Sequence, residues 1–92
     1  MLEEKAEAVS ALLKSISHPL RLKILCLLQD GEMTVGDIQA AVLTTNANVS
    51  QHLTKLRNQG IIAFRKEANF IYNRIADQRV VDLVNTLQKL FC

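Results

Sequence analysis

The sequence predicts a small α+β domain that is mainly helical, with four helices, a β-hairpin and a last helix in that order. Three observations support this. Hydrophobic residues make up 49% of the 92 residues and charged residues 22%, the balance of a packed globular domain. Apolar residues recur at helical spacing on both sides of one short segment in which they alternate with polar residues. The three glycines and the only proline lie near the ends of these segments, where helices and strands are expected to begin or end.

The first helix is expected from Leu2 to Ile16, and the second follows Ser17 and stops near Asp30-Gly31. Apolar residues recur every three or four positions in the first, and glutamates occupy its positive end. Ser17 is expected to cap the second helix, with Pro19 in its first turn. The second helix is apolar on most faces, so we expect it at the centre of the core.

The next two helices are short and close together. Thr34 can cap a helix over residues 35–42, and Thr45 can cap one over residues 46–58 that Gly60 ends. Only the turn at residues 43–45 separates them. Two short helices joined by a tight turn are a helix-turn-helix.

After Gly60 the apolar period changes from 3.6 to 2. Residues 62–66 alternate, and residues 70–75 are rich in aromatic and β-branched side chains, which predicts a hairpin with a polar tip. Helical spacing then returns from Val80 to Phe91. The complete order is a winged helix-turn-helix that occupies residues 1–92 as one domain.

The net charge of +2 is distributed unevenly along the chain. Residues 44–74 hold five basic side chains and one acidic side chain, whereas residues 1–43 hold four basic and six acidic ones. A basic surplus confined to one third of the chain is expected when one face of a protein meets a polyanion. Double-stranded DNA is therefore the expected partner.

The helix over residues 46–58 should present its polar face to the major groove. The alternative is an ordinary solvated face, but such faces usually carry Glu/Lys pairs, and this one has no acid. His52 lies between the two faces and suits either a DNA contact or a hydrogen bond inside the domain. Hairpin residues suit phosphates or a narrow minor groove, or simply a charged turn. The predicted DNA contacts are Thr45, Asn46, Asn48, Ser50, Gln51, His52, Thr54 and Lys55 on the helix, with Arg65, Lys66 and Asn69 in the hairpin.

Composition also excludes several classes. No apolar run reaches the roughly 18 residues of a membrane span, and the acidic start is unlike a secretory signal, so we expect a cytoplasmic protein. There is no Cys-x-x-Cys, no Gly-rich phosphate loop and no nucleophile–base–acid set, which argues against an enzyme or a cofactor. A chain this short buries only about 60–65% of its unfolded surface, so dimerisation is expected.

Four segments carry a family resemblance that extends over essentially the whole chain. They are Ser17-His18-Pro19-Leu20-Arg21, Thr34-Val35-Gly36-Asp37-Ile38, Val49-Ser50-Gln51-His52-Leu53 and Leu56-Arg57-Asn58-Gln59-Gly60. In this order they resemble the ArsR/SmtB family of bacterial repressors. The resemblance implies a homodimer formed by the first and last helices, which binds an inverted-repeat operator and leaves it when an inducer arrives.

The metal sites of that family are not matched. The segment Val35-Gly36-Asp37-Ile38 stands where the family's thiolate ligands would lie, and it has no cysteine. The last helix offers Asp77 and Asp82 but no histidine, whereas zinc prefers imidazole or thiolate among its ligands. We therefore expect no metal site.

The two cysteines, Cys26 and Cys92, allow two interpretations. Most cysteines in an apolar context such as that of Cys26 are small buried hydrophobes. However, residues 65–68 and the ending Phe91-Cys92 resemble the sulfide- and redox-responsive branch of the family (BigR/SqrR/HlyU-like regulators). That resemblance implies that oxidation or persulfide chemistry links the pair and lowers operator affinity. The alternatives are a regulator with structural cysteines and another trigger or none, and a winged helix that binds protein.

The chain departs from the family at the start of the predicted recognition helix. Thr45-Asn46-Ala47-Asn48 replaces the family's usual opening, and Leu43 stands where the family has a glycine in the preceding turn. The resemblance therefore does not extend to the base sequence of the operator.

Overall fold

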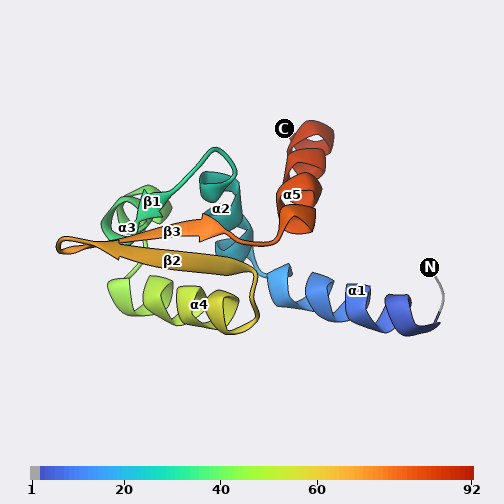
Figure 1. Cartoon of the computed structure of the whole chain (residues 1–92). Coiled ribbons are helices and arrows are strands. Elements are labelled where there is room, and N and C mark those ends of the chain that lie inside the picture. The colour runs from blue at the N-terminus through green and yellow to red at the C-terminus, as the bar shows by residue number, and fades with distance from the viewer. Residues whose placement is uncertain (1–2) are drawn as a thin grey trace.

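The structure is a computed structural model that describes residues 3–92, and its elements follow the predicted order. Leu2, which the apolar spacing assigned to the first helix, lies outside the described residues. The elements, drawn in Figure 1, are α1 (Glu3–Ile16), α2 (Pro19–Leu28), β1 (Met33–Thr34), α3 (Val35–Val42), α4 (Asn46–Asn58), β2 (Ile62–Glu67), β3 (Phe70–Ile75) and α5 (Gln78–Phe91).

The prediction that Ser17 caps α2 was wrong, because the N-cap residue is His18. The imidazole Nδ1 of His18 accepts a hydrogen bond from the backbone N–H of Leu20 over 3.1 Å. Pro19 is the first helical residue, and a proline disfavours helical backbone in the residue before it. His18 is accordingly extended, so the position directly before Pro19 becomes the cap.

The helix-turn-helix begins as predicted at both helices. The Thr34 hydroxyl accepts from the Asp37 N–H, and the Thr45 hydroxyl accepts from the Asn48 N–H, each over 3.1 Å. Between the helices, Leu43 ends α3 in the left-handed region at φ 53°. Left-handed backbone is unfavourable for a residue with a Cβ atom, so the turn is made at some expense in stability.

The hairpin belongs to a three-stranded antiparallel sheet in the order β1-β3-β2. Strand β1 was not predicted, because a two-residue strand has no detectable period. It pairs Met33 with Asn73 and Thr34 with Tyr72, so only the folded position of β3 defines it. The hairpin itself pairs Phe64 with Asn73 and turns back at Ala68, whose φ is 54°.

The core lies around α2, as its apolar composition predicted. Leu20, Ile24, Leu25 and Leu28 of α2 are all buried. The apolar residues that pack with them come from every other helix and from the base of the hairpin. The remaining buried hydrophobic residues are Ile16, Ile38, Val49, Leu53, Leu56, Ile61, Ile62, Val80 and Val84.

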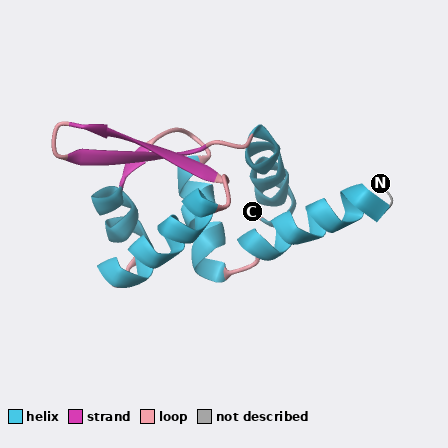
Figure 2. Cartoon of the chain, turned by 60° about the horizontal axis from the view of Figure 1, so that its bottom comes forward, coloured by secondary structure: helices cyan, strands magenta, loops and turns pink. Residues whose placement is uncertain are grey.

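Two elements project from opposite ends of this core (Figures 1 and 2). The hairpin extends past the start of α4, and α1 extends away on the other side, so the molecule measures 45 × 28 × 21 Å. From residue 3 onward, no helix has the length and apolar character needed to cross a membrane.

Candidate nucleic-acid interface and thiol pocket

Helix α4 has one buried face and one polar exposed face. Val49, Leu53 and Leu56 are at most 1% exposed and hold the helix against the core. The polar residues at the other positions are exposed, as the spacing predicted. The exposed candidates on or directly before α4 are Thr45, Asn46, Asn48, Ser50, Gln51, Thr54 and Lys55.

The first turn of α4 is ordered by its own polar side chains. Besides the Thr45 cap, the Asn48 amide Nδ2 donates to the Thr44 hydroxyl over 3.2 Å. The Asn48 side chain is exposed. Amides and hydroxyls of this kind can donate to and accept from base edges and phosphates.

His52 stands apart from the other α4 candidates because it is only 8% exposed. Its Nδ1 accepts a hydrogen bond from the Arg21 guanidinium Nε over 3.0 Å, and its ring lies 4.4 Å from the His18 ring. Burial, and then the charges of His18, Arg21 and Lys55, lower the pKa of His52. These contacts favour the structural interpretation of His52 over a DNA contact.

The hairpin carries its two basic candidates on opposite faces. Arg65 donates from Nε to Glu32 over 2.9 Å and from a terminal nitrogen to Glu67 over 2.6 Å, and its guanidinium lies 4.5 Å from the Tyr72 ring centroid. Hydrogen bonds to Glu32 and then to Glu67 raise the pKa of Arg65. Two carboxylates therefore offset the charge of Arg65.

Lys66 lies on the other face, the one that carries Phe64 toward α4. It is exposed, and no carboxylate of the described chain forms an ion pair with it. Asn69 is exposed at the hairpin tip. Among the three hairpin residues predicted to contact DNA, Lys66 and Asn69, rather than Arg65, have polar groups without a carboxylate partner in the described part of the chain.

A contact that the sequence reasoning missed joins α4 to the hairpin. The Arg57 guanidinium donates to the Asn73 amide oxygen over 2.7 Å and lies 4.6 Å from the Phe64 ring centroid. Asn73 is fully buried, and burial lowers the pKa of Arg57. Asparagine is unfavourable in a strand, so a polar residue at the centre of β3 was the available signal.

The two cysteines, which lie far apart in the sequence, line one pocket of about 380 Å³ between α2, α3 and α5. The sequence context favoured a buried Cys26, but both residues are exposed free thiols in the part of the chain described. Position 26 faces outward because Ile24, Leu25 and Leu28 take the buried face of α2. Partial burial, and then the neighbouring Cys92 thiolate, raise the pKa of Cys26.

No group of three His, Cys, Asp or Glu side chains within residues 3–92 is arranged to hold a metal ion. The thiol pair therefore lacks the further ligands that a tetrahedral zinc site would need.

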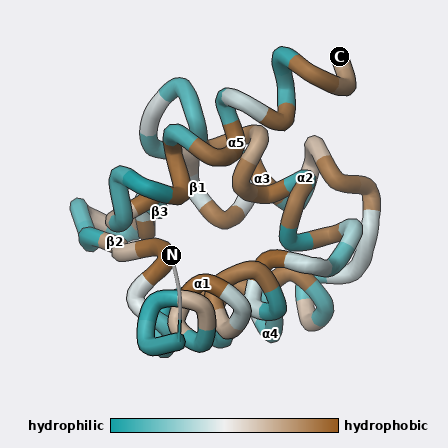
Figure 3. Tube along the Cα trace, turned by 90° about the vertical axis from the view of Figure 1, so that its right-hand side faces the viewer, coloured by the Kyte–Doolittle hydropathy of each residue, from teal (hydrophilic) through white to brown (hydrophobic). Residues whose placement is uncertain are grey.

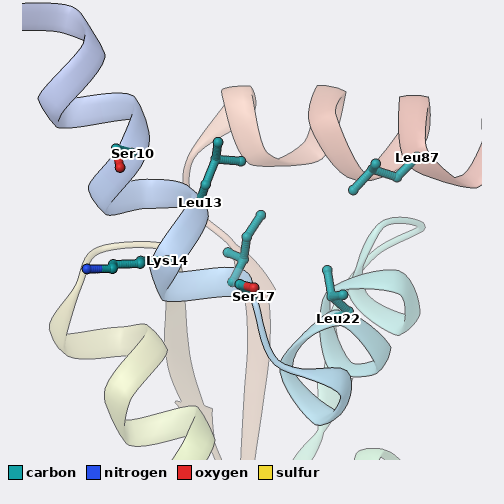
Figure 4. A pocket seen from close by; sticks show the side chains of 7 residues that line it. Ser10, Leu13, Lys14, Ser17, Leu22 and Leu87 are labelled. Atoms are coloured by element: carbon teal, nitrogen blue, oxygen red, sulfur yellow. The ribbon is translucent and has the colours of Figure 1, made fainter.

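A second hollow of about 370 Å³ opens between α1, α2 and α5 (Figure 4). Leu13, Leu22 and Leu87 point toward it, and Leu13 is 46% exposed. The trace near the C-terminus is coloured as hydrophobic (Figure 3). Leu90 and Phe91, at the end of α5, are 71% and 80% exposed. Exposed apolar side chains of this kind on α1 and α5 are typical of a face that packs against another protein.

The fold and the exposed surfaces define the class of protein. A helix-turn-helix places an amide- and hydroxyl-rich helix beside a hairpin that presents a free lysine, with a neutral-to-basic surface on both elements. That arrangement is a winged-helix DNA-binding regulator.

Comparison with known proteins identifies the family. The model described as "Bacterial regulatory protein, arsR family" matches residues 18–63. The Biofilm growth-associated repressor of Xylella fastidiosa is 36% identical over 91 residues, which are 99% of this chain and 80% of that protein. The Transcriptional activator HlyU of Vibrio cholerae is 32% identical over 99% of this chain and 84% of its own length. The chain belongs to the arsR family of bacterial transcriptional regulators.

Solved structures agree with this assignment. HlyU from Vibrio cholerae N16961 superposes with a TM-score of 0.94 at 32% identity, covering 99% of each chain. The transcriptional repressor BigR from Xylella fastidiosa superposes with a TM-score of 0.91 at 36% identity, covering 97% of this chain and 91% of that one. The chain is similar to both over nearly its whole length.

Proposed function

We propose that this chain is a homodimeric repressor whose affinity for its operator falls when Cys26 and Cys92 become covalently linked. The observation that carries the proposal is the shared pocket, in which a thiol from α2 lies beside the thiol that follows α5. Family membership supports the DNA-binding part, and the resemblance to the sulfide- and redox-responsive branch supports the trigger.

The proposed DNA contacts combine α4 with the hairpin. The exposed α4 face enters the major groove, where Asn46, Asn48 and Gln51 suit base edges, and Lys55 suits a phosphate. Lys66 and Asn69 contact the adjacent backbone or minor groove. Arg65 is given no direct contact in this proposal, because two carboxylates already bind it.

The dimer is proposed to form through α1 and α5. The apolar hollow around Leu13 and Leu87 supports this, as do the exposed Leu90 and Phe91. A two-fold dimer presents two α4 helices to two half-sites, which must lie about one helical turn apart on DNA. An inverted-repeat operator follows from that symmetry.

Polysulfide chemistry can link the two thiols without a metal. A thiolate attacks a polysulfide sulfur and takes it up as a persulfide, and the remaining shorter polysulfide leaves. The second thiolate then attacks the first cysteine's sulfur, an S–S bond forms and hydrosulfide leaves. The link ties α2 to the end of α5. Because α5 is a proposed dimer helix, the tie changes the spacing of the two α4 helices and weakens operator binding.

The experiment is fluorescence anisotropy with DNA from the region upstream of the protein's own gene. Reduced protein is compared with polysulfide-treated protein, and intact mass is measured for each. We expect salt-sensitive binding that weakens about tenfold or more on treatment, together with a mass that corresponds to a Cys26–Cys92 link. Cys26→Ser and Cys92→Ser proteins should bind DNA as well as the reduced wild type and should not respond.

Two other results would point elsewhere. If either serine variant still responds to polysulfide, the cysteines are structural and the regulator has another trigger or none. If the protein binds no DNA, including sequences selected from a random pool, but captures a protein partner with little salt dependence, the winged helix serves protein contact.

A further inference from the structure

The pocket that holds the two thiols has a mostly aliphatic lining. Leu22 and Leu27 of α2 and Ala41 and Val42 of α3 form its apolar wall, and no lining residue is acidic. Lys23 and Gln88 are the polar groups beside the thiols. A volume of about 380 Å³ can hold a small organic molecule, and such sites bind mainly through apolar contact with a few placed polar groups.

We propose that this pocket binds small organic hydroperoxides, and that the aliphatic wall holds their apolar body while the peroxide group meets the thiol pair. The inference rests on the proposed thiol switch and assigns it a class of reactant. An inorganic polysulfide or hydrogen peroxide gains nothing from Leu22, Leu27 and Val42, because neither has apolar surface to bury. An alkyl or aryl hydroperoxide has that surface and also the oxidising group.

The reaction needs only the hydroperoxide and the two cysteines. The Cys92 thiolate attacks the terminal peroxide oxygen, so that an S–O bond forms, the O–O bond breaks and the organic alkoxide leaves to become an alcohol. Cys92 is now a sulfenic acid, two electrons more oxidised. Cys26 then attacks its sulfur, an S–S bond forms, and the hydroxyl leaves as water with the proton of Cys26. Two thiols and one hydroperoxide thus give one disulfide, one alcohol and one water.

The surroundings suit this division of roles. Cys26 is an exposed thiol of α2 that lines the pocket, and its raised pKa fits the thiol that reacts second. The wall residues Ala41 and Val42 are the last residues of α3, directly before the turn that leads to α4. An occupant of the pocket therefore also touches the helix-turn-helix.

The test compares rates of thiol loss with cumene hydroperoxide and with hydrogen peroxide. The ratio of the two second-order rate constants is measured for folded protein and for the same chain in denaturant, where no pocket exists. Ala41→Leu fills the pocket. Ala40→Leu is the matched control, because Ala40 is exposed on the same helix and does not line the pocket.

We expect the ratio to be about tenfold higher in folded wild type than in the denatured chain, a gain that corresponds to about two buried methylene groups. Ala41→Leu should return the ratio to the denatured value, and Ala40→Leu should keep the wild-type ratio. Equal ratios in folded and denatured wild type, or no change in Ala41→Leu, would overturn the proposal.

The same samples separate this inference from the proposed function. If the ratio shows no selectivity but polysulfide still releases DNA from the wild type and not from Cys26→Ser, the switch stands and the hydroperoxide pocket is wrong. If the ratio is selective and a disulfide forms while DNA binding is unchanged, the pocket stands and the switch is wrong.

Discussion

His52 connects the recognition helix to the start of α2, and its neutral form is the one that fits. Arg21 donates to Nδ1 of His52, so the neutral ring carries its proton on Nε2. Arg21 also donates to the backbone carbonyl of Ser15 at the end of α1 over 2.7 Å. Protonation of His52 would set a ring N–H against the Arg21 N–H in a half-buried cluster, which is unfavourable.

We therefore expect stability to fall on acidification through His52. Its folded-state pKa is lowered, so the unfolded chain binds this proton first as the pH falls. The stabilisation is fully present above about pH 6.5, the unfolded value, and is lost as the pH falls through the folded pKa. Urea unfolding at pH 7.5 and pH 5.5, at one protein concentration, measures it. His52→Gln should be less stable at pH 7.5 by about 1 kcal/mol and should lose less on acidification. Parallel losses in the two proteins would show that His52 does not carry the effect.

Leu43 is strained and nearly fully exposed, at φ 53° and 88% exposure. Left-handed backbone destabilises a residue with a Cβ atom by about 1–2 kcal/mol, and glycine would remove this strain. Part of the stabilisation is lost because glycine increases the conformational entropy of the unfolded chain. Leu43→Gly should stabilise the protein by about 0.5–1 kcal/mol and raise its Tm by several degrees.

Thermal unfolding at fixed concentration checks the Leu43 prediction. Ala40→Gly is the control, because Ala40 is exposed in the right-handed helix α3 and glycine there should destabilise by about 1 kcal/mol. A loss of stability in both variants would mean that the Leu43 side chain makes contacts that outweigh its strain, for example against a second subunit.

At the scale of elements, the two faces of the hairpin separate a cation without a carboxylate partner among residues 3–92, Lys66, from a paired one, Arg65. Lys66 lies on the α4 side, and Arg65 lies on the opposite face with Glu32 and Glu67. Each phosphate that the protein neutralises releases counterions from the DNA. The slope of log affinity against log salt concentration therefore reports the number of neutralised phosphates. Lys66→Ala should weaken DNA binding and reduce the slope of log affinity against log salt by about one for each protomer that contacts DNA.

Arg65→Ala is the matched comparison for the hairpin prediction. Arg65→Ala also removes one positive charge, at the neighbouring residue. It should leave the slope of log affinity against log salt nearly unchanged, because the Arg65 guanidinium is paired with carboxylates rather than with phosphates. Anisotropy titrations at four salt concentrations give both slopes. If Arg65→Ala lowers the slope as much as Lys66→Ala, Arg65 leaves its ion pairs when DNA binds.

The same elements show how far the sequence could predict this molecule. Helix positions, the Thr34 and Thr45 caps and the buried face of α4 depend on local period and polarity, so they could be predicted. Strand β1, the Arg57–Asn73 contact and the pairing of Arg65 with Glu32 depend on where distant segments meet. No local pattern encodes such a meeting. The thiol pocket could be predicted only in part. A family resemblance indicated that Cys26 and Cys92 form a pair, but only the folded chain shows the aliphatic side chains around them.

At the scale of the whole molecule, the monomer leaves large hydrophobic side chains exposed on its first and last helices. Helix α1 extends away from the core (Figure 1). Its Leu13 is half exposed, and α5 ends in two exposed hydrophobic residues. Burial of these surfaces against a second copy would supply the apolar area that a chain of this length lacks. Unfolding should then depend on concentration, with Tm rising as protein concentration rises.

The sharpest test of the dimer is a charge placed on the proposed interface. Leu13→Glu puts a carboxylate into the hollow shared with Leu87, whereas Ala11→Glu puts the same charge on the opposite, exposed face of α1. An unpaired charge is unfavourable in a buried apolar interface, so Leu13→Glu should be monomeric by analytical ultracentrifugation at micromolar concentration, and Ala11→Glu should be dimeric. Because two linked α4 helices bind two half-sites cooperatively, the monomer should bind an inverted repeat about 100-fold more weakly or worse. Its affinity for a single half-site should match that of Ala11→Glu, since α4 and the hairpin are untouched. A Leu13→Glu protein that stays dimeric would place the interface elsewhere on the molecule. The thiol pocket would then have to affect α4 within one subunit, through Ala41 and Val42 of α3.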